Sequence, residues 1–335
     1  MKDPTVYVLH RPNARCTNKS EEFSVTMHMD ADGFRRTTQT NRPQNPSILV
    51  LGDSFTFGHG VKDEEAYPAV LESSLRSKGI SARVLNAGIS GVGLDWYYLF
   101  LKERARQYNP SAILVGVFLG NDMFDHMYFD TTVRDSNGLP ITLLTSAEYV
   151  LSDGTRNYTN TPFRYRIPFF RNSHLVQILA TALGGHVNAE GLLTNGSPCF
   201  FQESCHEIDT HLSHTKILLQ GMKKQADDMH IPLHIVLIPW EAQLPAKLIL
   251  RSKGTVYAVN KKNRYRINSE ILTYCDQLQL SCIDLLPAFE KYEGNSQVFF
   301  PKDTHWNATG HEIAGEYLAS KLEAILFPPI KMETE

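Results

Sequence analysis

The chain has 335 residues, a formal net charge of −3, and 42% hydrophobic and 21% charged residues. Such a composition is ordinary for a globular protein, and the length allows one large domain or two modest ones. The small net charge gives no basis for binding nucleic acid or an anionic membrane, and no apolar run approaches the roughly 18 residues of a membrane span.

Residues 1–46 carry scattered prolines and polar residues and alternate only weakly around residues 23–27. They are predicted to form an irregular arm packed on the core, with one or two edge strands and a turn at 32–35 that places Phe34 on the main body. The first residues lack the apolar core of a signal peptide. The arm nevertheless resembles a segment that follows a signal or anchor, so we expect a periplasmic or secreted protein if the N-terminus is trimmed, and otherwise a cytoplasmic one.

From residue 47 onward, short apolar runs alternate with segments of helical periodicity, which is typical of βαβ units and a parallel sheet. This part, residues 47–335, is predicted to be the main domain. The expected strands are residues 48–51, 83–86, 112–119, 233–238 and 282–285, and the expected helices are residues 65–78, 94–108, 208–229, 264–279 and 308–326.

The alternation stops between about residues 123 and 206. A structureless loop of that length is improbable in a compact domain, so we expect an inserted cap that contains a helix at 173–183. Aromatic residues gather there and either pack internally or offer a stacking surface for sugar rings; they are Phe163, Tyr165, Phe169 and Phe170.

Cysteine spacing leaves the redox state open. Cys199 and Cys205 flank a short polar loop and could form a local disulfide, which would imply an oxidising compartment. Cys275 and Cys282 could be a second pair or two small buried residues. No cysteine spacing resembles a zinc knuckle, and no metal or cofactor is expected.

Polar clusters follow three of the expected strands. Ser54 comes after Gly52-Asp53, Gly91 ends a glycine-rich loop, and Asn121 follows the third strand. The carboxyl ends of parallel strands meet at one edge of a sheet, where such folds bind their ligands. Taken singly, Gly91 could simply allow a turn and Asn121 could cap a helix.

The same polar blocks, together with Asp303 and His305 before the last helix, resemble those of the SGNH (GDSL-type) hydrolases. Residues 52–58, G-D-S-F-T-F-G, resemble the first block of that family, residues 86–91 the second, residues 120–122 the third and residues 303–305 the last. The resemblance implies a flavodoxin-like three-layer α/β/α sandwich with strand order 2-1-3-4-5. The arm and the insertion lie outside it.

The resemblance assigns a role to each block. Ser54 is the expected nucleophile, His305 the base and Asp303 the acid that orients it; the amides of Ser54 and Gly91 and the side chain of Asn121 form the expected oxyanion hole. The chemistry agrees, because a serine hydroxyl needs a base to take its proton and an imidazole of pKa near 6.5 serves near neutral pH. The partner of the other ring N–H of His305 stays open: it is Asp303 if the loop between them allows the contact, and otherwise a backbone carbonyl.

Other residues near these blocks receive simpler interpretations. His59 and Phe169 are possible substrate contacts, and Asp53 is expected to brace the turn before Ser54. Asn307 is expected to cap the last helix, and His311 within it to be a surface or packing residue.

The last block departs from the usual spacing, because it reads D-x-H where many family members have D-x-x-H. The run 303–307, D-T-H-W-N, is closer to the branch of bacterial polysaccharide O-acetyltransferases. The expected activity is hydrolysis of small acyl esters, with acetyl esters on carbohydrate as the expected substrates. The alternatives are an O-acetyltransferase acting on a cell-surface polysaccharide and a catalytically silent carbohydrate-binding protein. Oligomeric state is not predicted.

Overall fold

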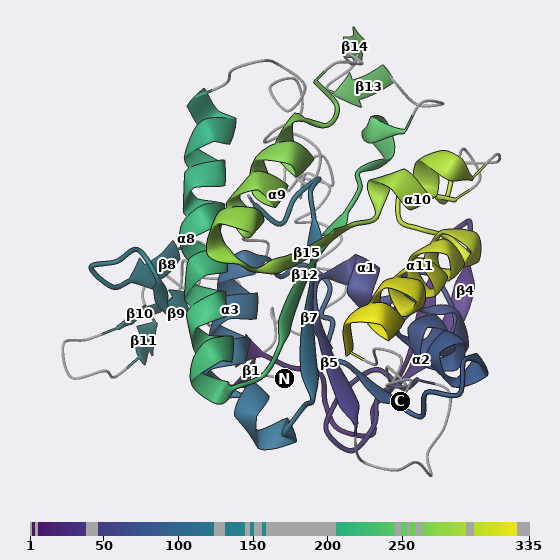
Figure 1. Ribbon diagram of the computed structural model, residues 1–335, viewed down its shortest axis with the longest axis horizontal. Helices are drawn as coiled ribbons and strands as arrows, with labels where there is room; N and C mark the ends of the chain where they lie inside the picture. Colours follow the sequence, from purple (N-terminus) through teal and green to yellow (C-terminus); the bar gives the residue numbers. More distant parts are fainter. Residues whose placement is uncertain are drawn as a thin grey trace, which may run out of the picture.

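A five-stranded parallel sheet lies at the centre of the protein (Figure 1). The structure is a computed structural model that describes residues 2–3, 6–37, 46–123, 131–144, 148–150, 156–158, 206–244, 249–252, 255–258, 263–292 and 298–326. The sheet order is β15-β12-β7-β5-β6, which in chain order is 2-1-3-4-5, as predicted. The strands are β5 (Ser47–Leu51), β6 (Arg83–Asn86), β7 (Ala112–Phe118), β12 (Leu233–Ile238) and β15 (Ser281–Asp284).

The three central strands β5, β7 and β12 are buried along their whole length. Their near-continuous apolar sequences are those of strands covered on both faces. Val50 pairs with Leu114, and Val236 pairs with Gly116, so the carboxyl ends of neighbouring strands reach the same edge.

Helices cover both faces of the sheet, which gives the predicted three layers (Figure 1). α3 packs on α8 and α8 on α9, while α11 packs on α2 and α10 on the other face. Their bounds are α2 (Tyr67–Ser77), α3 (Leu94–Glu103), α8 (His206–Met229), α9 (Arg266–Leu278), α10 (Leu286–Lys291) and α11 (Ala308–Leu326).

Two predicted helices are shorter than expected. The helix predicted at 65–78 divides into a 3-10 turn, η1 (Asp63–Glu65), and α2, because Pro68 lies in the first turn of α2 and has no amide N–H with which to extend the helix backward. The helix predicted at 94–108 ends with α3, and a 3-10 turn, η2 (Ala105–Tyr108), follows it.

The N-terminal residues form two small antiparallel hairpins apart from the main sheet. They are β1 (Lys2–Asp3) with β2 (Tyr7–Val8), and β3 (Arg15–Lys19) with β4 (Ser24–His28). Phe34 is buried against Phe100 and Tyr108. Arg35 is 1% exposed, and its guanidinium donates to backbone carbonyls of the segment after Ser54, including Phe57 and Val61 at 2.6 Å each.

The predicted cap falls mostly outside the described residues, including its helix at 173–183 and its aromatic cluster with Phe169. Its described part starts with a hairpin of β8 (Thr131–Arg134) and β9 (Pro140–Leu144). The Arg134 guanidinium makes a bidentate contact with the buried Asp95 carboxylate on α3 at 2.7 and 3.0 Å, which joins this hairpin to the core. Smaller elements are β10 (Glu148–Val150) with β11 (Arg156–Tyr158), β13 (Ile249–Ser252) with β14 (Thr255–Ala258), and η4 (Glu241–Gln243).

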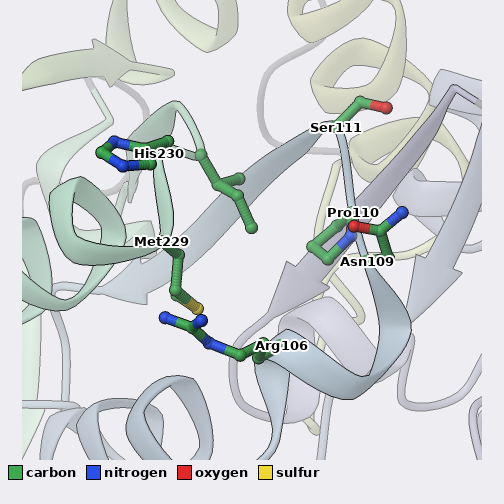
Figure 2. Close-up of a pocket in the computed structure, with 7 residues that line it drawn as sticks. Arg106, Asn109, Pro110, Ser111, Met229 and His230 are labelled. Atoms are coloured by element: carbon green, nitrogen blue, oxygen red, sulfur yellow. The ribbon is translucent and has the colours of Figure 1, made fainter.

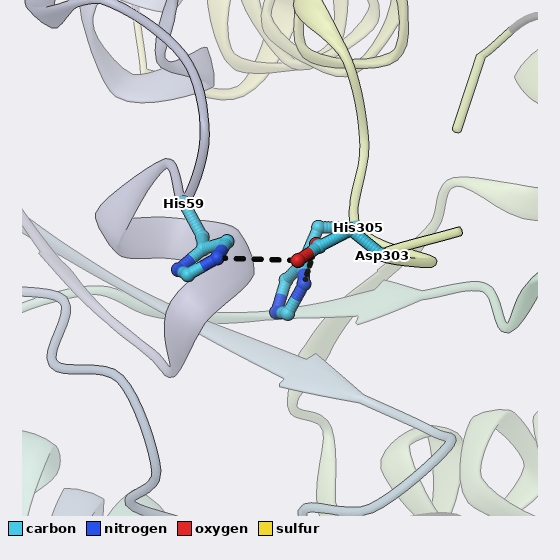
Figure 3. Close-up of side chains that lie close together, drawn as sticks. All are labelled: His59, Asp303 and His305. Carbon is cyan, nitrogen blue, oxygen red and sulfur yellow. Dashed lines mark hydrogen bonds and ion pairs between the residues drawn. The ribbon is translucent and has the colours of Figure 1, made fainter. Parts of the chain in front are cut away.

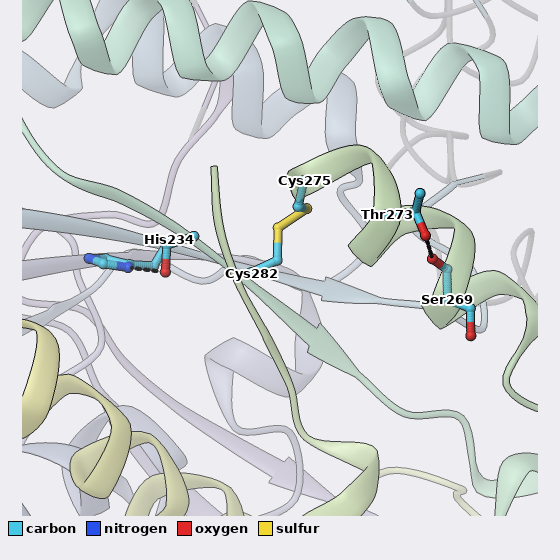
Figure 4. Close-up of a disulfide and its surroundings, with 6 residues drawn as sticks. His234, Ser269, Thr273, Cys275 and Cys282 are labelled. Carbon is cyan, nitrogen blue, oxygen red and sulfur yellow. Dashed lines mark hydrogen bonds between the residues drawn. A yellow bond between two sulfur atoms is a disulfide. The ribbon is translucent and has the colours of Figure 1, made fainter. Parts of the chain in front are cut away.

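Cys275 and Cys282 form a disulfide that joins the end of α9 to the start of β15 (Figure 4). Of the two alternatives that the sequence left open for this pair, the structure shows the disulfide. The pair Cys199–Cys205 lies outside the described residues, and Cys16 is a free, exposed cysteine. No helix in the described parts of the chain combines the length and apolar character that crossing a membrane requires.

Candidate active site

Ser54 lies at the carboxyl end of β5, where it is the first residue of the short helix α1 (Ser54–Phe57). The turn that brings it there requires glycine at position 52, because a Cβ would come within 2.0 Å of Thr56 Oγ1. The Asp53 carboxylate accepts the Phe55 amide at 2.9 Å and caps the helix. Asp53 therefore braces the turn, as the sequence indicated, and Ser54 remains 8% exposed.

His305 comes from the other end of the chain and reaches Ser54. Its Nε2 lies 2.8 Å from Ser54 Oγ, and its Nδ1 lies 2.6 Å from Asp303 Oδ1. A carboxylate at Nδ1 selects the tautomer with the proton on that nitrogen, which leaves Nε2 as an acceptor. The Ser54 hydroxyl then donates to His305 at 2.8 Å in preference to Asp53 Oδ2 at 3.3 Å.

A positive backbone angle at Thr304 makes the close Asp303–His305 contact possible despite the short D-x-H spacing. Thr304 has φ +69°, an uncommon conformation for a β-branched residue. The loop is closed by the Phe300 amide, which donates to the His305 carbonyl at 2.8 Å, and by the Thr304 amide, which donates to the Phe300 carbonyl at 3.3 Å. The side chains of Asp303 and His305 thus leave the loop on the same side, where they meet.

Asp303 also faces a second imidazole, that of His59 (Figure 3). His59 Nε2 lies 3.5 Å from Asp303 Oδ2, and the His59 and His305 rings lie 4.4 Å apart. Partial burial alone would raise the pKa of the Asp303 carboxyl, but the hydrogen bonds and charges of His305 and His59 outweigh it and hold that pKa well below its usual value.

His59, Asp303 and His305 are also the one group of metal-ligand side chains that the described residues bring together, with donor atoms within 4.8 Å of one another. Hydrogen bonds already engage these atoms, since His305 uses both nitrogens and Asp303 both oxygens. These contacts account for the arrangement of the three side chains.

Gly91 and Asn121 occupy the loops that follow β6 and β7, the two neighbours of β5 in the sheet. Gly91 has φ +76°, in the left-handed region that favours glycine. Its loop is tied to the Ser54 turn, because the Ile89 amide donates to the Gly52 carbonyl at 3.0 Å. Behind Asn121, the Asp122 carboxylate accepts from the Phe118 amide and the Tyr97 hydroxyl, each at 2.8 Å.

Two further expectations concern the last helix. Asn307 caps α11, since its side-chain oxygen accepts the Gly310 amide at 3.2 Å. His311 is a packing residue and not a surface one: it is 1% exposed, lies against Tyr67 and Trp306, and accepts the Tyr67 amide at Nδ1.

Several residues around the site carry no signal in the sequence. Glu22 of the β3–β4 hairpin accepts backbone amides of the loop that carries Asp303, and Asn18 donates to His59 at 3.2 Å. These contacts join residues far apart in the chain, so only a fold-level comparison could have found them.

A separate hollow of about 510 Å³ lies at the opposite edge of the sheet (Figure 2). Ser111 and Ile231, which line it, precede β7 and β12, whereas Ser54 follows a strand. None of the candidate site residues that the structure describes lines this hollow.

A parallel α/β sheet with a hydrogen-bonded Ser–His–Asp chain at its carboxyl edge is an arrangement found in serine hydrolases. The chain belongs to the GDSL-like Lipase/Acylhydrolase family, a family of carboxylic ester hydrolases, since the model of that family matches residues 50–313. The match spans the turn of Ser54 as well as Asp303 and His305, and it confirms the family resemblance seen in the sequence.

Among solved structures, the chain is similar to a lipase/acylhydrolase from Enterococcus faecalis, at 12% identity over 84% of this chain and 96% of that one, with a TM-score of 0.46. It is also similar to the psychrotrophic esterase EstA from Pseudoalteromonas sp., at 11% identity over 84% and 99%, with a TM-score of 0.43. No curated protein matches the sequence. The family assignment therefore rests on the match of the family model to residues 50–313 and not on these solved structures.

Proposed function

We propose that this GDSL-type acylhydrolase is a serine esterase that hydrolyses small acyl esters through an acyl-enzyme on Ser54, with acetyl esters of carbohydrate as the favoured substrates. The observation that carries the proposal is the continuous chain of short contacts from Asp303 through His305 to Ser54, at 2.6 and 2.8 Å. These lengths fall in the range over which a base can take a hydroxyl proton.

In the first half of the reaction, Ser54 Oγ attacks the ester carbonyl carbon while His305 Nε2 takes the hydroxyl proton. Asp303 accepts the Nδ1–H of the ring and stabilises the imidazolium that forms. The carbon–oxygen bond to the alcohol then breaks, and the leaving oxygen takes the proton from His305. The products of this half are the free alcohol and an acyl group on Ser54.

In the second half, water attacks the acyl carbon and gives a proton to His305. The bond to Ser54 Oγ breaks, the serine oxygen regains the proton, and the carboxylic acid leaves. In both halves the negative carbonyl oxygen would be met by the amides of Ser54 and Gly91 and by the side chain of Asn121. The loss of one such donor typically costs about 2.7–4 kcal/mol of transition-state stabilisation.

The D-x-H spacing resembles that of the bacterial polysaccharide O-acetyltransferases, so the alternative to hydrolysis is transfer of the acyl group to a glycan hydroxyl instead of water. Both reactions proceed through the same acyl-enzyme, so the residues assigned above serve either. They differ only in the acceptor of the second half.

The test compares wild type with Ser54→Ala on an aryl acetate, its longer-chain homologues and an acetylated glycan, with and without an unacetylated glycan as acceptor. We expect turnover by wild type, strongest for acetyl, and a loss on the order of 10⁴-fold or more in Ser54→Ala. Acetylated acceptor among the products would indicate transfer. Absence of turnover together with failure of a phosphonate to label Ser54 would contradict the proposal and leave a silent binding protein.

A further inference from the structure

The β3–β4 hairpin (Arg15–His28) of the N-terminal arm contacts the loop that carries Asp303 and His305. The tip of the hairpin has a fixed shape, because the Ser20 hydroxyl accepts the Glu22 amide at 3.0 Å and the Phe23 amide at 3.3 Å. These hydrogen bonds fix the backbone at Glu22 and so the position of its Cβ.

Glu22 binds the backbone of that loop directly. Its carboxylate accepts the Asp303 amide at 2.8 Å and the Lys302 amide at 3.0 and 3.1 Å. Amides that donate to a charged carboxylate make stronger hydrogen bonds than those that donate to neutral groups. Beside it, the Phe23 and Phe300 rings lie 5.0 Å apart.

The loop needs an external partner at this position. Its internal bonds, from the Phe300 and Thr304 amides, close its two ends, whereas the amides of Lys302 and Asp303 donate to Glu22. Between them and His305 lies Thr304 with its positive φ, an unfavourable conformation that persists only where the surroundings hold it. Glu22 holds Lys302 and Asp303, the two residues that precede Thr304 in the turn.

The same hairpin also reaches the other oxygen of Asp303. Asn18 on β3 donates to His59 Nδ1 at 3.2 Å, which leaves the Nε2–H of His59 to face Asp303 Oδ2 at 3.5 Å. Phe23 stands edge-on to the His59 ring, with the ring centroids 5.3 Å apart. The hairpin therefore restrains the Asp303 backbone through Glu22 and its carboxylate through His59.

We propose that Glu22 is a positioning residue for the Asp303–His305 pair, and that the N-terminal hairpin is thereby part of the active site. The proposal rests on the function proposed above. Glu22 does not contact Ser54 or the reacting atoms; it acts by fixing the amide of Asp303, and with it the angle at which the carboxylate meets His305. A displacement of about 1 Å in such a group can cost 10²-fold in rate.

The neighbouring Glu21 supplies a matched control. Its carboxylate also contacts Lys302, but through the side-chain ammonium, and both partners are exposed, at 80% and 71%. An exposed ion pair of this kind contributes little. If mere attachment of the hairpin to the loop mattered, loss of either glutamate would have a comparable effect.

The experiment measures kcat, KM and melting temperature for wild type, Glu22→Ala, Glu22→Gln and Glu21→Ala on an aryl acetate, along with the rate of phosphonate labelling of Ser54. For Glu22→Ala we expect kcat to fall about 10- to 100-fold and labelling to slow in parallel, with KM within twofold. The melting temperature should fall, because the hydrogen bonds of Glu22 to the loop are lost, and the melting curve shows whether the variant is still folded. Glu22→Gln keeps one acceptor oxygen and should fall between. Glu21→Ala should stay within twofold of wild type.

The proposal would be overturned by a kcat of Glu22→Ala within twofold of wild type, or by an equal fall in Glu21→Ala. If Glu22→Ala does not fold, the same criteria apply to Glu22→Gln. Failure here leaves wild-type turnover and Ser54 labelling intact, whereas failure of the proposed function removes both, so the two results are distinguishable.

Discussion

Asp303 lies between two imidazole rings and carries its charge because of them. Its burial disfavours the charged form, yet His305 at 2.6 Å and His59 at 3.5 Å stabilise the carboxylate and lower its pKa. A carboxylate that remains ionised throughout the useful pH range can hold the His305 tautomer without itself becoming protonated. His59, a possible substrate contact by its position in the sequence, is therefore also placed to support the acid.

Replacement of Asp303 by Asn should reverse the preference of His305 for the tautomer with its proton on Nδ1. The amide can donate to Nδ1, which selects the wrong tautomer of His305, so kcat should fall by about 10³–10⁴-fold while Ser54 and His305 stay in place. Measurement of kcat for Asp303→Asn beside wild type checks this, and a fall of less than tenfold would argue against the role of Asp303.

The same variant tests the pKa of Asp303 through stability. Because its folded pKa lies below the unfolded value near 3.9, the carboxylate stabilises the fold above about pH 4, and this contribution is lost as pH falls through the folded pKa. Urea unfolding at pH 2.5 to 6 should show the stability gap between wild type and Asp303→Asn narrowing below pH 4. A gap that stays constant would mean that the pKa is not lowered.

At the scale of elements, the loop from Val298 to Asn307 shows which features the sequence could reveal. The strands and helices around it were predictable, because apolar runs and helical periodicity are local signals. The hydrogen bond between Asp303 and His305 was an expectation of the family resemblance that the residues themselves left open, because it depends on a positive φ at Thr304, where no glycine marks the turn. The Glu22 contacts could not be predicted from local sequence patterns either, since they join residues 280 and 281 positions apart.

Because the Asp303–His305 contact depends on the positive φ of Thr304, two substitutions at this position should have opposite effects. Thr304→Gly accepts φ +69° without the steric cost of a Cβ, so activity should stay within about threefold and stability within about 1 kcal/mol of wild type. Thr304→Pro fixes φ near −65° and removes the amide that donates to Phe300. It should separate Asp303 from His305 and lower kcat at least 10²-fold. Equal activity of the two variants would show that the turn is not required.

At the scale of the whole molecule, several ionisable side chains outside the Ser54–His305–Asp303 chain are buried. Burial lowers the pKa of His10 and His234 to about 4 and that of His311 well below its usual value. In the unfolded chain these histidines have pKa values near 6.5. Between about pH 4 and 6.5 the unfolded chain therefore binds more protons than the folded protein, so the free energy of unfolding falls as the pH falls from about 6.5. Asp30 and Asp284 act in the opposite direction, because burial raises their pKa values.

A single substitution separates one of these contributions from the rest. His234 on β12 is 3% exposed and its Nδ1 lies 2.8 Å from Ser281 Oγ (Figure 4), a contact that the amide of Asn can replace. His234→Asn removes the titration, so it should gain roughly 2–3 kcal/mol relative to wild type as pH falls from 7 to 4, whatever its offset at pH 7. Urea unfolding across this range measures the difference, and a gap that does not change with pH would mean that His234 titrates alike in the folded and unfolded chain. Because His234 lies near the amino end of its strand, the kcat of the variant at pH 7 should match that of wild type, which separates the stability of the sheet from the chemistry at its carboxyl edge.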